Sequence, residues 1–235
     1  NKASAGNVMN GTYFARRVGG PGEFGSPQFY DLEKGVDLSL SGETSHTADG
    51  QTVYFHSVRP TNLGYQQKPP TDDFLDIYAA EVKDGKPGPG INLGPPVNSI
   101  YPDGEHFITP DGRTLYFTSS RPGGLGGNDL YVSHKTKQGW SKPENLGSPV
   151  NTPRSEMQPA FAFNDLNTMY WTSDRNPTIG TAIYRARRGR DGRWSEPELV
   201  LRGIAGEPTL TADGRFLYFV HVLTDAQGVF DADVW

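Results

Sequence analysis

The feature that most constrains the fold is a pair of neighbouring aromatic residues that recurs along the chain together with its surroundings. The pair occurs as Tyr54-Phe55, Tyr116-Phe117, Tyr170-Trp171 and Tyr218-Phe219. An aspartate stands five residues before each tyrosine, at Asp49, Asp111, Asp165 and Asp213. A Ser-x-Arg triplet follows the first three pairs, ending at Arg59, Arg121 and Arg175. Several markers locked to one period of roughly 50 residues predict a repeat architecture.

The stretch from Glu105 to Asn151 shows what one repeat contains. EHFIT and TLYFTS are two predicted strands, joined by a Pro110-Asp111-Gly112 turn. DLYVSHK is a third strand after the loop RPGGLGGN, and a fourth begins at Trp140. The strands are rich in the aromatic and β-branched residues that favour sheets. A single unit of this size cannot bury both of its faces, so it is expected to stack on copies of itself.

The markers divide the chain into repeats within one all-β domain that covers residues 1–235. The expected repeats are about 1–42, 43–98, 105–151, 156–200 and 207–235. The first is degenerate, with TYFARR and QFYDLE as its second and third strands. The last stops inside its third strand, so 36–40 or 3–9 is expected to complete it. Five repeats are predicted; the alternative is four repeats, with residues 1–35 as an extension.

The motif PDGRTLYFTSSRPGGLGGNDLY resembles the TolB-like, WD-like β-propeller repeat of bacterial envelope proteins. The resemblance is best over 103–151 and extends more loosely over about 43–235. It implies a β-propeller, in which four-stranded blades surround a central channel. The family includes the periplasmic TolB propeller, propellers joined to peptidoglycan-binding domains, and propellers attached to hydrolases and lyases. The fold therefore does not fix the function.

Composition excludes some classes of function. The formal net charge of −5 argues against nonspecific binding of nucleic acids. The chain has no cysteine, so disulfide bonds and thiol chemistry are excluded. No stretch reaches the roughly 18 apolar residues of a membrane-spanning helix, so membrane insertion is not expected. The motifs of serine hydrolases, zinc peptidases and phosphate-binding loops are also missing.

Propeller topology predicts where a binding site would lie. The start of each first strand and each loop between the second and third strands share one face, at the mouth of the channel. Glu43, Glu105 and Glu207 open the first strands, each six residues before the turn aspartate. Glu156 stands nine residues before its aspartate, because the turn of that repeat carries an insertion. Arginines at the starts of the loops complete the candidate ligand-binding set: Arg59, Arg121 and Arg175.

Two interpretations of this set remain open. In the functional one, glutamates and arginines bind a polar ligand, or a divalent cation such as Ca²⁺ binds in the central channel. In the structural one, they only connect neighbouring blades, as their repetition suggests. His46 and His106 follow Glu43 and Glu105 by three residues and one residue. Both histidines are expected to point away from the channel if the glutamates face it, which weakens the case for a histidine-containing metal site.

The first functional hypothesis is a noncatalytic binding propeller of the bacterial envelope, periplasmic or secreted, that holds a protein, peptide or glycan at the channel mouth. It would be a monomer or part of a larger envelope protein. The alternative is an enzyme, such as a glycoside hydrolase or a metal-dependent lactonase or lyase, that uses the carboxylates of the mouth. A deep pocket with one desolvated glutamate beside an ionised one would favour the enzyme.

Overall fold

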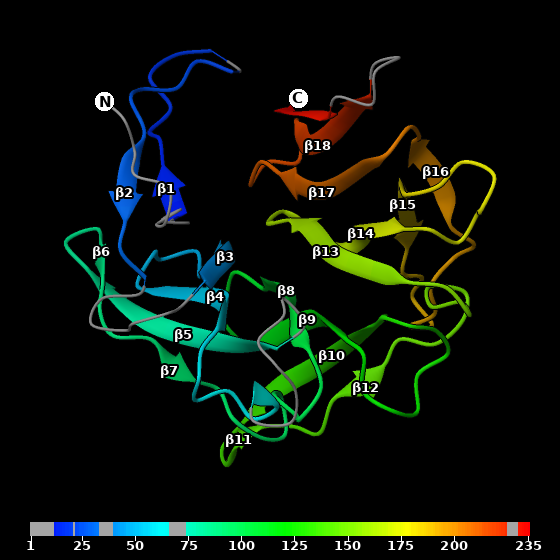
Figure 1. Ribbon diagram of the computed structural model, residues 1–235, viewed down its shortest axis with the longest axis horizontal. Coiled ribbons are helices and arrows are strands. Elements are labelled where there is room, and N and C mark those ends of the chain that lie inside the picture. Colours follow the sequence, from blue (N-terminus) through cyan, green and yellow to red (C-terminus); the bar gives the residue numbers. More distant parts are fainter. Residues whose placement is uncertain (1–11, 21, 33–39, 66–73, 225–229) are drawn as a thin grey trace.

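Four antiparallel sheets and one two-stranded ladder make up the chain in the computed structural model (Figure 1). The structure describes residues 1–235 apart from 1–11, 21, 33–39, 66–73 and 225–229. The described residues are all-β and contain no helix, which confirms the predicted fold class. It follows that no helix in that part of the chain is long and apolar enough to cross a membrane.

The strands follow the chain order within each sheet. The ladder consists of β1 (Thr12–Phe14) and β2 (Gln28–Tyr30). The next sheet contains β3 (Leu40–His46), β4 (Thr52–Val58), β5 (Leu75–Lys83), β6 (Lys86–Pro87) and β7 (Ile91–Asn92). It is followed by β8 (Asp103–Ile108), β9 (Thr114–Ser119), β10 (Asp129–Thr136), β11 (Gly139–Trp140) and β12 (Glu144–Asn145). The last two sheets contain β13 (Glu156–Ala162), β14 (Asp165–Ser173), β15 (Ala182–Arg187) and β16 (Glu198–Leu201), then β17 (Ala205–Leu210), β18 (Leu217–Thr224) and β19 (Phe230–Val234).

The first strand of each sheet lies nearest the centre of the molecule. Strand β8 contacts β3 on one side and β13 on the other, and β13 also contacts β17. The later strands of each sheet lie progressively farther out (Figure 1). The β17–β19 sheet has three strands among the described residues, and β19 pairs there with β18 alone. The sheets are thus arranged around a common centre, as the resemblance to propellers predicts.

The repeated turn and loop motifs have visible structural roles. In the turn between β8 and β9, the hydroxyl of Thr109 donates to Asp111, and Gly112 has a φ of 67° that other residues avoid. The Asn-Leu-Gly-x-Pro-Val-Asn motif lies after the third strand. The side chain of its last residue, Asn151, hydrogen-bonds both backbone groups of Leu130 at 2.9 Å. Asn98 bonds Ile77 in the same way, so the motif fastens each connecting segment to its own sheet.

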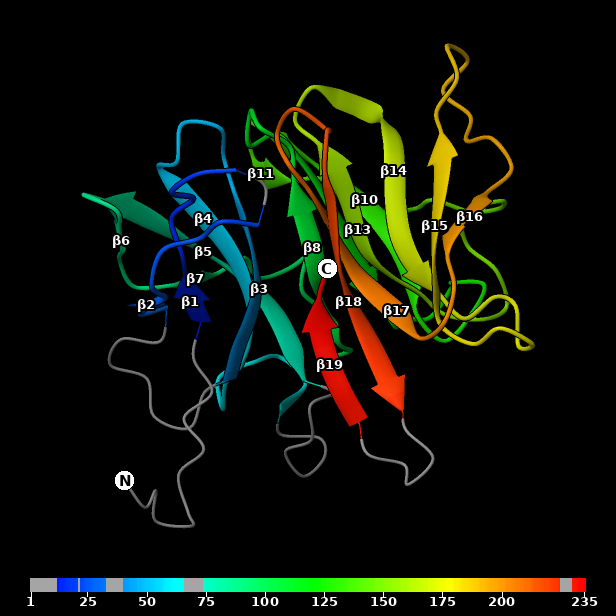
Figure 2. The ribbon, with the colours of Figure 1, turned by 90° about the horizontal axis from the view of Figure 1, so that it is seen from above.

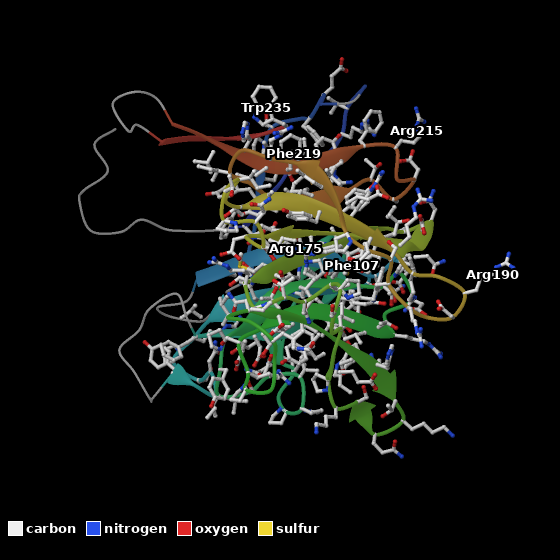
Figure 3. All side chains as sticks on the ribbon, turned by 90° about the vertical axis from the view of Figure 1, so that its right-hand side faces the viewer. Phe107, Arg175, Arg190, Arg215, Phe219 and Trp235 are labelled. Carbon is white, nitrogen blue, oxygen red and sulfur yellow. The ribbon has the colours of Figure 1, made fainter. Side chains whose placement is uncertain are left out.

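The recurring aromatic pairs form the cores between sheets. Phe55, Phe117 and Trp171 are completely buried. The last pair departs from this pattern, because Tyr218 and Phe219 are only partly buried. Figure 3 shows Phe219 near one edge of the molecule, whereas Phe107 lies deep among the packed side chains. The outer aromatic pair is thus less covered than sequence equivalence predicts, because no further complete sheet packs over it among the described residues.

The N-terminal ladder connects the first and last sheets. Strands β1 and β2 coincide with the cores of the predicted TYFARR and QFYDLE strands, and lie beside the β3–β7 sheet (Figures 1 and 2). Tyr30 and Leu32 are buried there against Phe55. The loop between β1 and β2 reaches the last sheet, where Phe24 meets Tyr218 with ring centroids 6.3 Å apart. The candidates for completing the last sheet, 3–9 and 36–39, lie outside the described residues, and Leu40 belongs to β3.

Candidate functional site

One position in each inner strand has the same unusual backbone. Of the six described residues other than glycine with left-handed φ angles, four occupy equivalent places, with φ of 34°, 41°, 58° and 54°: Glu43, Glu105, Gln158 and Glu207. The pairing register of β3, β8, β13 and β17 shifts at these places, which marks a β-bulge in each. Such backbone conformations cost of order 1–3 kcal/mol and concentrate at functional sites. These four residues are therefore candidates for a functional site.

Hydrogen bonds from the neighbouring sheet hold three of the bulges. The backbone N–H of Glu105 donates to Nδ1 of His56 at 3.1 Å. The N–H groups of Gln158 and Glu207 donate to the hydroxyls of Thr118 and Thr172, at 3.2 and 3.1 Å. In each case the acceptor lies on the second strand of the preceding sheet. The bulges are therefore fixed by contacts between sheets, which positions the side chains toward the centre.

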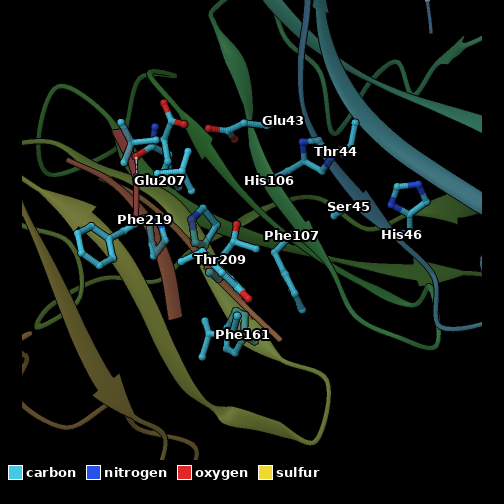
Figure 4. Close-up of a pocket in the computed structure, with 18 of the residues that line it drawn as sticks. Glu43, Thr44, Ser45, His46, His106, Phe107, Phe161, Glu207, Thr209 and Phe219 are labelled. Carbon is cyan, nitrogen blue, oxygen red and sulfur yellow. Dashed lines mark hydrogen bonds between the residues drawn. The ribbon is translucent and has the colours of Figure 1, made fainter. Parts of the chain in front are cut away.

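A cavity of about 640 Å³ opens at the centre, lined by the inner strands of all four large sheets. Glu43 and Glu207 lie on its wall with their side chains directed toward each other (Figure 4). Much of the remaining wall is aromatic: Phe24, Phe107, Phe161, Phe163, Tyr218 and Phe219. Within the described part of the chain, no lysine or arginine lines the cavity. Its volume lies in the range of small-molecule binding pockets.

Burial and mutual repulsion perturb the carboxyl groups at this centre. Removal from water raises the pKa of Glu43 well above its usual value, and the carboxylates of Glu105 and Glu207 raise it further. Burial raises the pKa of Glu105 to about 7, with a smaller contribution from Glu207. The amide of Gln158 donates to Glu105 at 3.4 Å and opposes the shift. Glu43 and Glu105 are therefore the carboxyl groups whose pKa this centre raises.

His46 and His106 both belong to the cavity wall (Figure 4). The ring of His46 nevertheless faces Tyr30, with Nε2 3.4 Å from the tyrosine oxygen, and both ring nitrogens of His106 are buried inside the wall. Neither imidazole therefore offers a nitrogen to a metal ion in the cavity. His106 is only 6% exposed, and burial lowers its pKa to about 3. Its imidazole is neutral at physiological pH.

The arginines and Glu156 lie elsewhere, between sheets. Arg121 donates to the backbone oxygen of Val97 and to Asp103, with a 2.6 Å ion pair to the latter. Arg175 makes the same contacts one sheet later, to the backbone oxygen of Val150 and to Glu156. Neither arginine nor Glu156 lines the cavity. These residues fasten the connections between neighbouring sheets.

Arg59 occupies the corresponding place in the first large sheet. It is buried, lies 4.0 Å from the ring centroid of Tyr78, and donates to the backbone oxygen of Leu32 at 3.4 Å. It therefore contacts the N-terminal segment instead of the cavity. The structure brings together the predicted glutamates Glu43, Glu105 and Glu207, but not the predicted arginines.

Gln158 is the residue that sequence reasoning missed. Glu156 pairs with Ser173 as Asp103 pairs with Ser119, so Glu156 corresponds to Asp103 and not to Glu105. Gln158 holds the glutamate position, seven residues before Asp165. The local sequence Gln158-Pro159-Ala160-Phe161 matches Glu207-Pro208-Thr209-Leu210 and would have shown this alignment. The insertion in that repeat is thus one residue.

The possible cation site finds little support in this arrangement. Among the described residues, no group of three histidine, aspartate or glutamate side chains is placed to hold a metal ion. The described residues thus contain no cluster of carboxylates and imidazoles arranged as metal ligands.

Comparison with known proteins identifies the fold. No family model matches the chain, and no curated protein matches it in sequence. Among solved structures, TolB from Acinetobacter baumannii is similar with a TM-score of 0.51 and 16% identity, over 91% of this chain. An α-L-arabinofuranosidase from Lactobacillus brevis is similar with a TM-score of 0.54 and 12% identity, over 89% of this chain and 77% of the enzyme.

A puromycin-hydrolysing peptidase from Mycobacterium tuberculosis is also similar, with a TM-score of 0.50 and 10% identity, over 94% of this chain and 33% of the peptidase. The chain spans 44% of the length of the TolB structure from Acinetobacter. At these identities the likeness concerns the fold alone. Together with the sheets around a common centre, it shows that the chain has a TolB-like β-propeller fold.

Proposed function

We propose that this chain is a noncatalytic binding propeller of the bacterial envelope, periplasmic or secreted, whose ligand occupies the central cavity. The proposal rests on one observation: Glu43, Glu207 and several aromatic side chains line the same cavity of about 640 Å³. Carboxylates supply directional hydrogen bonds and aromatic rings supply contact area, which is the usual composition of a small-molecule or glycan pocket. Resemblance to envelope propellers supports the location.

We further propose five blades, with β1 and β2 as part of the first. In support, the ladder lies beside the β3–β7 sheet, and its loop reaches the β17–β19 sheet. The N-terminal segment then forms part of the cavity wall through Phe24. The ligand, a peptide, a glycan or a smaller molecule, would enter between the first and last blades.

A matched pair of variants tests the binding site. Thr209 is exposed to the cavity, so Thr209→Trp would fill it without disturbing a core. Thr178 is exposed in a loop outside the cavity, and Thr178→Trp makes the same change there. Calorimetry with envelope glycan fragments and short peptides should find a ligand that binds wild type and Thr178→Trp but not Thr209→Trp. A ligand that binds all three equally would place the site elsewhere.

A second candidate function is glycoside hydrolysis. Glu105 favours it, because a carboxyl group with a pKa of about 7 beside other glutamates is suited to donate a proton. Hydrolysis would require a second carboxylate at a defined distance on the other side of the glycosidic bond. Incubation with arabinan and peptidoglycan fragments tests this. Release of reducing sugar by wild type, abolished in Glu105→Gln, would establish the enzyme and overturn the noncatalytic proposal.

A further inference from the structure

The charged side chains that the structure places on the cavity wall are all acidic. Glu43 and Glu207 stand on the wall, and Glu105 is connected to them through Gln158. The described residues of the wall include no cationic side chain that could neutralise them. Carboxylates in such surroundings repel one another unless a positive charge lies between them. A ligand that carries this positive charge would remove the repulsion.

The wall of the same cavity contains a buried histidine, His106. His106 is 6% exposed and lines the wall, and neither ring nitrogen makes a hydrogen bond of good geometry. The backbone of Tyr54 is close enough to affect its pKa, but could satisfy only one of the two nitrogens. A buried polar atom without a partner destabilises the fold. Both nitrogens are buried, so His106 contributes surface to the wall and no hydrogen bond to a ligand.

The aromatic part of the wall suits the rest of such a ligand. Phe107 and Phe161 lie with ring centroids 5.1 Å apart, and both line the cavity. On another side, Phe24 and Tyr218 form a second aromatic contact. Aromatic rings attract ammonium groups through their faces and give contact area to alkyl chains. Acidic and aromatic groups thus converge on one space.

We propose that the ligand of this cavity is an organic cation, a protonated primary amine on an apolar stem. The ammonium group lies between the carboxylates of Glu43 and Glu207, and the stem lies against the aromatic wall. The inference rests on the proposed binding function and specifies the chemistry of its ligand. A free alkylamine or diamine and a lysine side chain share this chemistry.

Calorimetric titration with matched probes tests the charge requirement. The probes are pentylamine, 1,5-diaminopentane, 1-pentanol and pentanoate, which share a five-carbon stem, and a second arm uses Nα-acetyl-lysine amide. The two amines should bind, and the alcohol and the acid should not. Binding in the second arm would indicate a peptide lysine as the source, and binding of the diamine alone would indicate a free polyamine. Equal binding of pentylamine and 1-pentanol would overturn the inference.

Variants locate the bound ammonium group. Glu207→Gln and Glu43→Gln should each weaken amine binding by about tenfold or more, since each removes a charge-assisted hydrogen bond. Glu198→Gln is the control, because Glu198 is exposed and pairs with Arg185 outside the cavity. Unfolding midpoints show whether each variant is folded. Unchanged amine affinity in a folded Glu43→Gln, Glu207→Gln double variant would overturn the proposal.

The two levels of the proposal fail in different ways. If neutral glycans or peptides bind and Thr209→Trp blocks them, while no amine binds, the cavity is a binding site and the amine inference is wrong. If neither amines nor glycans nor peptides bind in a manner that Thr209→Trp abolishes, the proposed function itself is wrong. Amine binding should also release protons at pH 7, because it favours ionised Glu43 and Glu105.

Discussion

The backbone N–H of Glu105 donates to Nδ1 of His56 across the boundary between two neighbouring sheets, over 3.1 Å. This bond requires a neutral imidazole, because a protonated ring has no acceptor nitrogen. The next two boundaries use threonine hydroxyls, Thr118 and Thr172, for the same purpose. His56 is therefore the one acceptor in this series whose function depends on pH.

Replacing His56 should change the stability of the protein in acid. Burial lowers the pKa of His56 from 6.5 to about 4 in the folded chain. The unfolded chain therefore takes up a proton first, so His56 destabilises the fold progressively as pH falls from about 6.5 to 4. His56→Thr copies Thr118 and should reduce the loss of stability between pH 7 and pH 5, measured by denaturant midpoints. His134→Thr, at an exposed histidine, serves as the control, and an equal pH response in both variants would contradict the prediction.

Glu105→Gln should have the opposite pH dependence. The pKa of Glu105 is raised from 4.5 to about 7, so its favourable contribution is complete below 4.5 and is lost as pH rises through about 7. The variant should therefore gain stability at pH 8 relative to wild type, and much less at pH 4. Each kcal/mol gained raises the melting temperature by about 2–4 °C in a chain of this size. An equal loss at both pH values would show instead that the carboxylate joins the sheets.

The two equivalent aromatic positions Phe117 and Phe219 should differ in importance. Phe117 is fully buried, and Phe117→Ala should cost about 3–5 kcal/mol of unfolding free energy. Phe219 is partly exposed on the cavity wall, so Phe219→Ala should cost clearly less. Urea denaturation of both variants measures the difference. Equal losses would show that Phe219 is as well covered as its counterpart.

The buried pair of Asp103 and Arg121 should matter more than the exposed pair of Arg185 and Glu198. The side chain of Asp103 is completely buried and that of Arg121 is 15% exposed, whereas those of Arg185 and Glu198 are 38% and 63% exposed. Asp103→Ala leaves a buried arginine without its partner and should cost about 3 kcal/mol. Glu198→Ala should cost less than about 1 kcal/mol. Comparable denaturation midpoints for the two variants would contradict this ranking.

The sequence predicted the all-β class and the role of the aromatic pairs because those features depend on local periodicity. The spacing to the turn aspartates also drew attention to Glu43 and Glu207, which lie on the cavity wall; their role as ligand-binding residues stays a prediction. The β-bulge at Glu105 could not be predicted, since it leaves no clear mark in the sequence. Arg121 and Arg175 were assigned to the mouth because position along the chain does not show that their partners are backbone oxygens of the preceding connection.

Removal of the N-terminal segment should destabilise the first large sheet and open the cavity. Tyr30 and Leu32 cover Phe55, and Phe24 contacts Tyr218 in the last sheet. Deleting residues 1–33 would expose these aromatic surfaces, so we expect a lower melting temperature and aggregation.

Two single variants separate the loss of stability from the opening of the cavity. Tyr30→Ala should lower stability, because Tyr30 is buried, whereas Phe24→Ala should mainly enlarge the cavity, because Phe24 is 49% exposed. Light scattering and thermal unfolding distinguish these outcomes. A deletion variant that is soluble and as stable as the full chain would show that the segment is not part of the propeller.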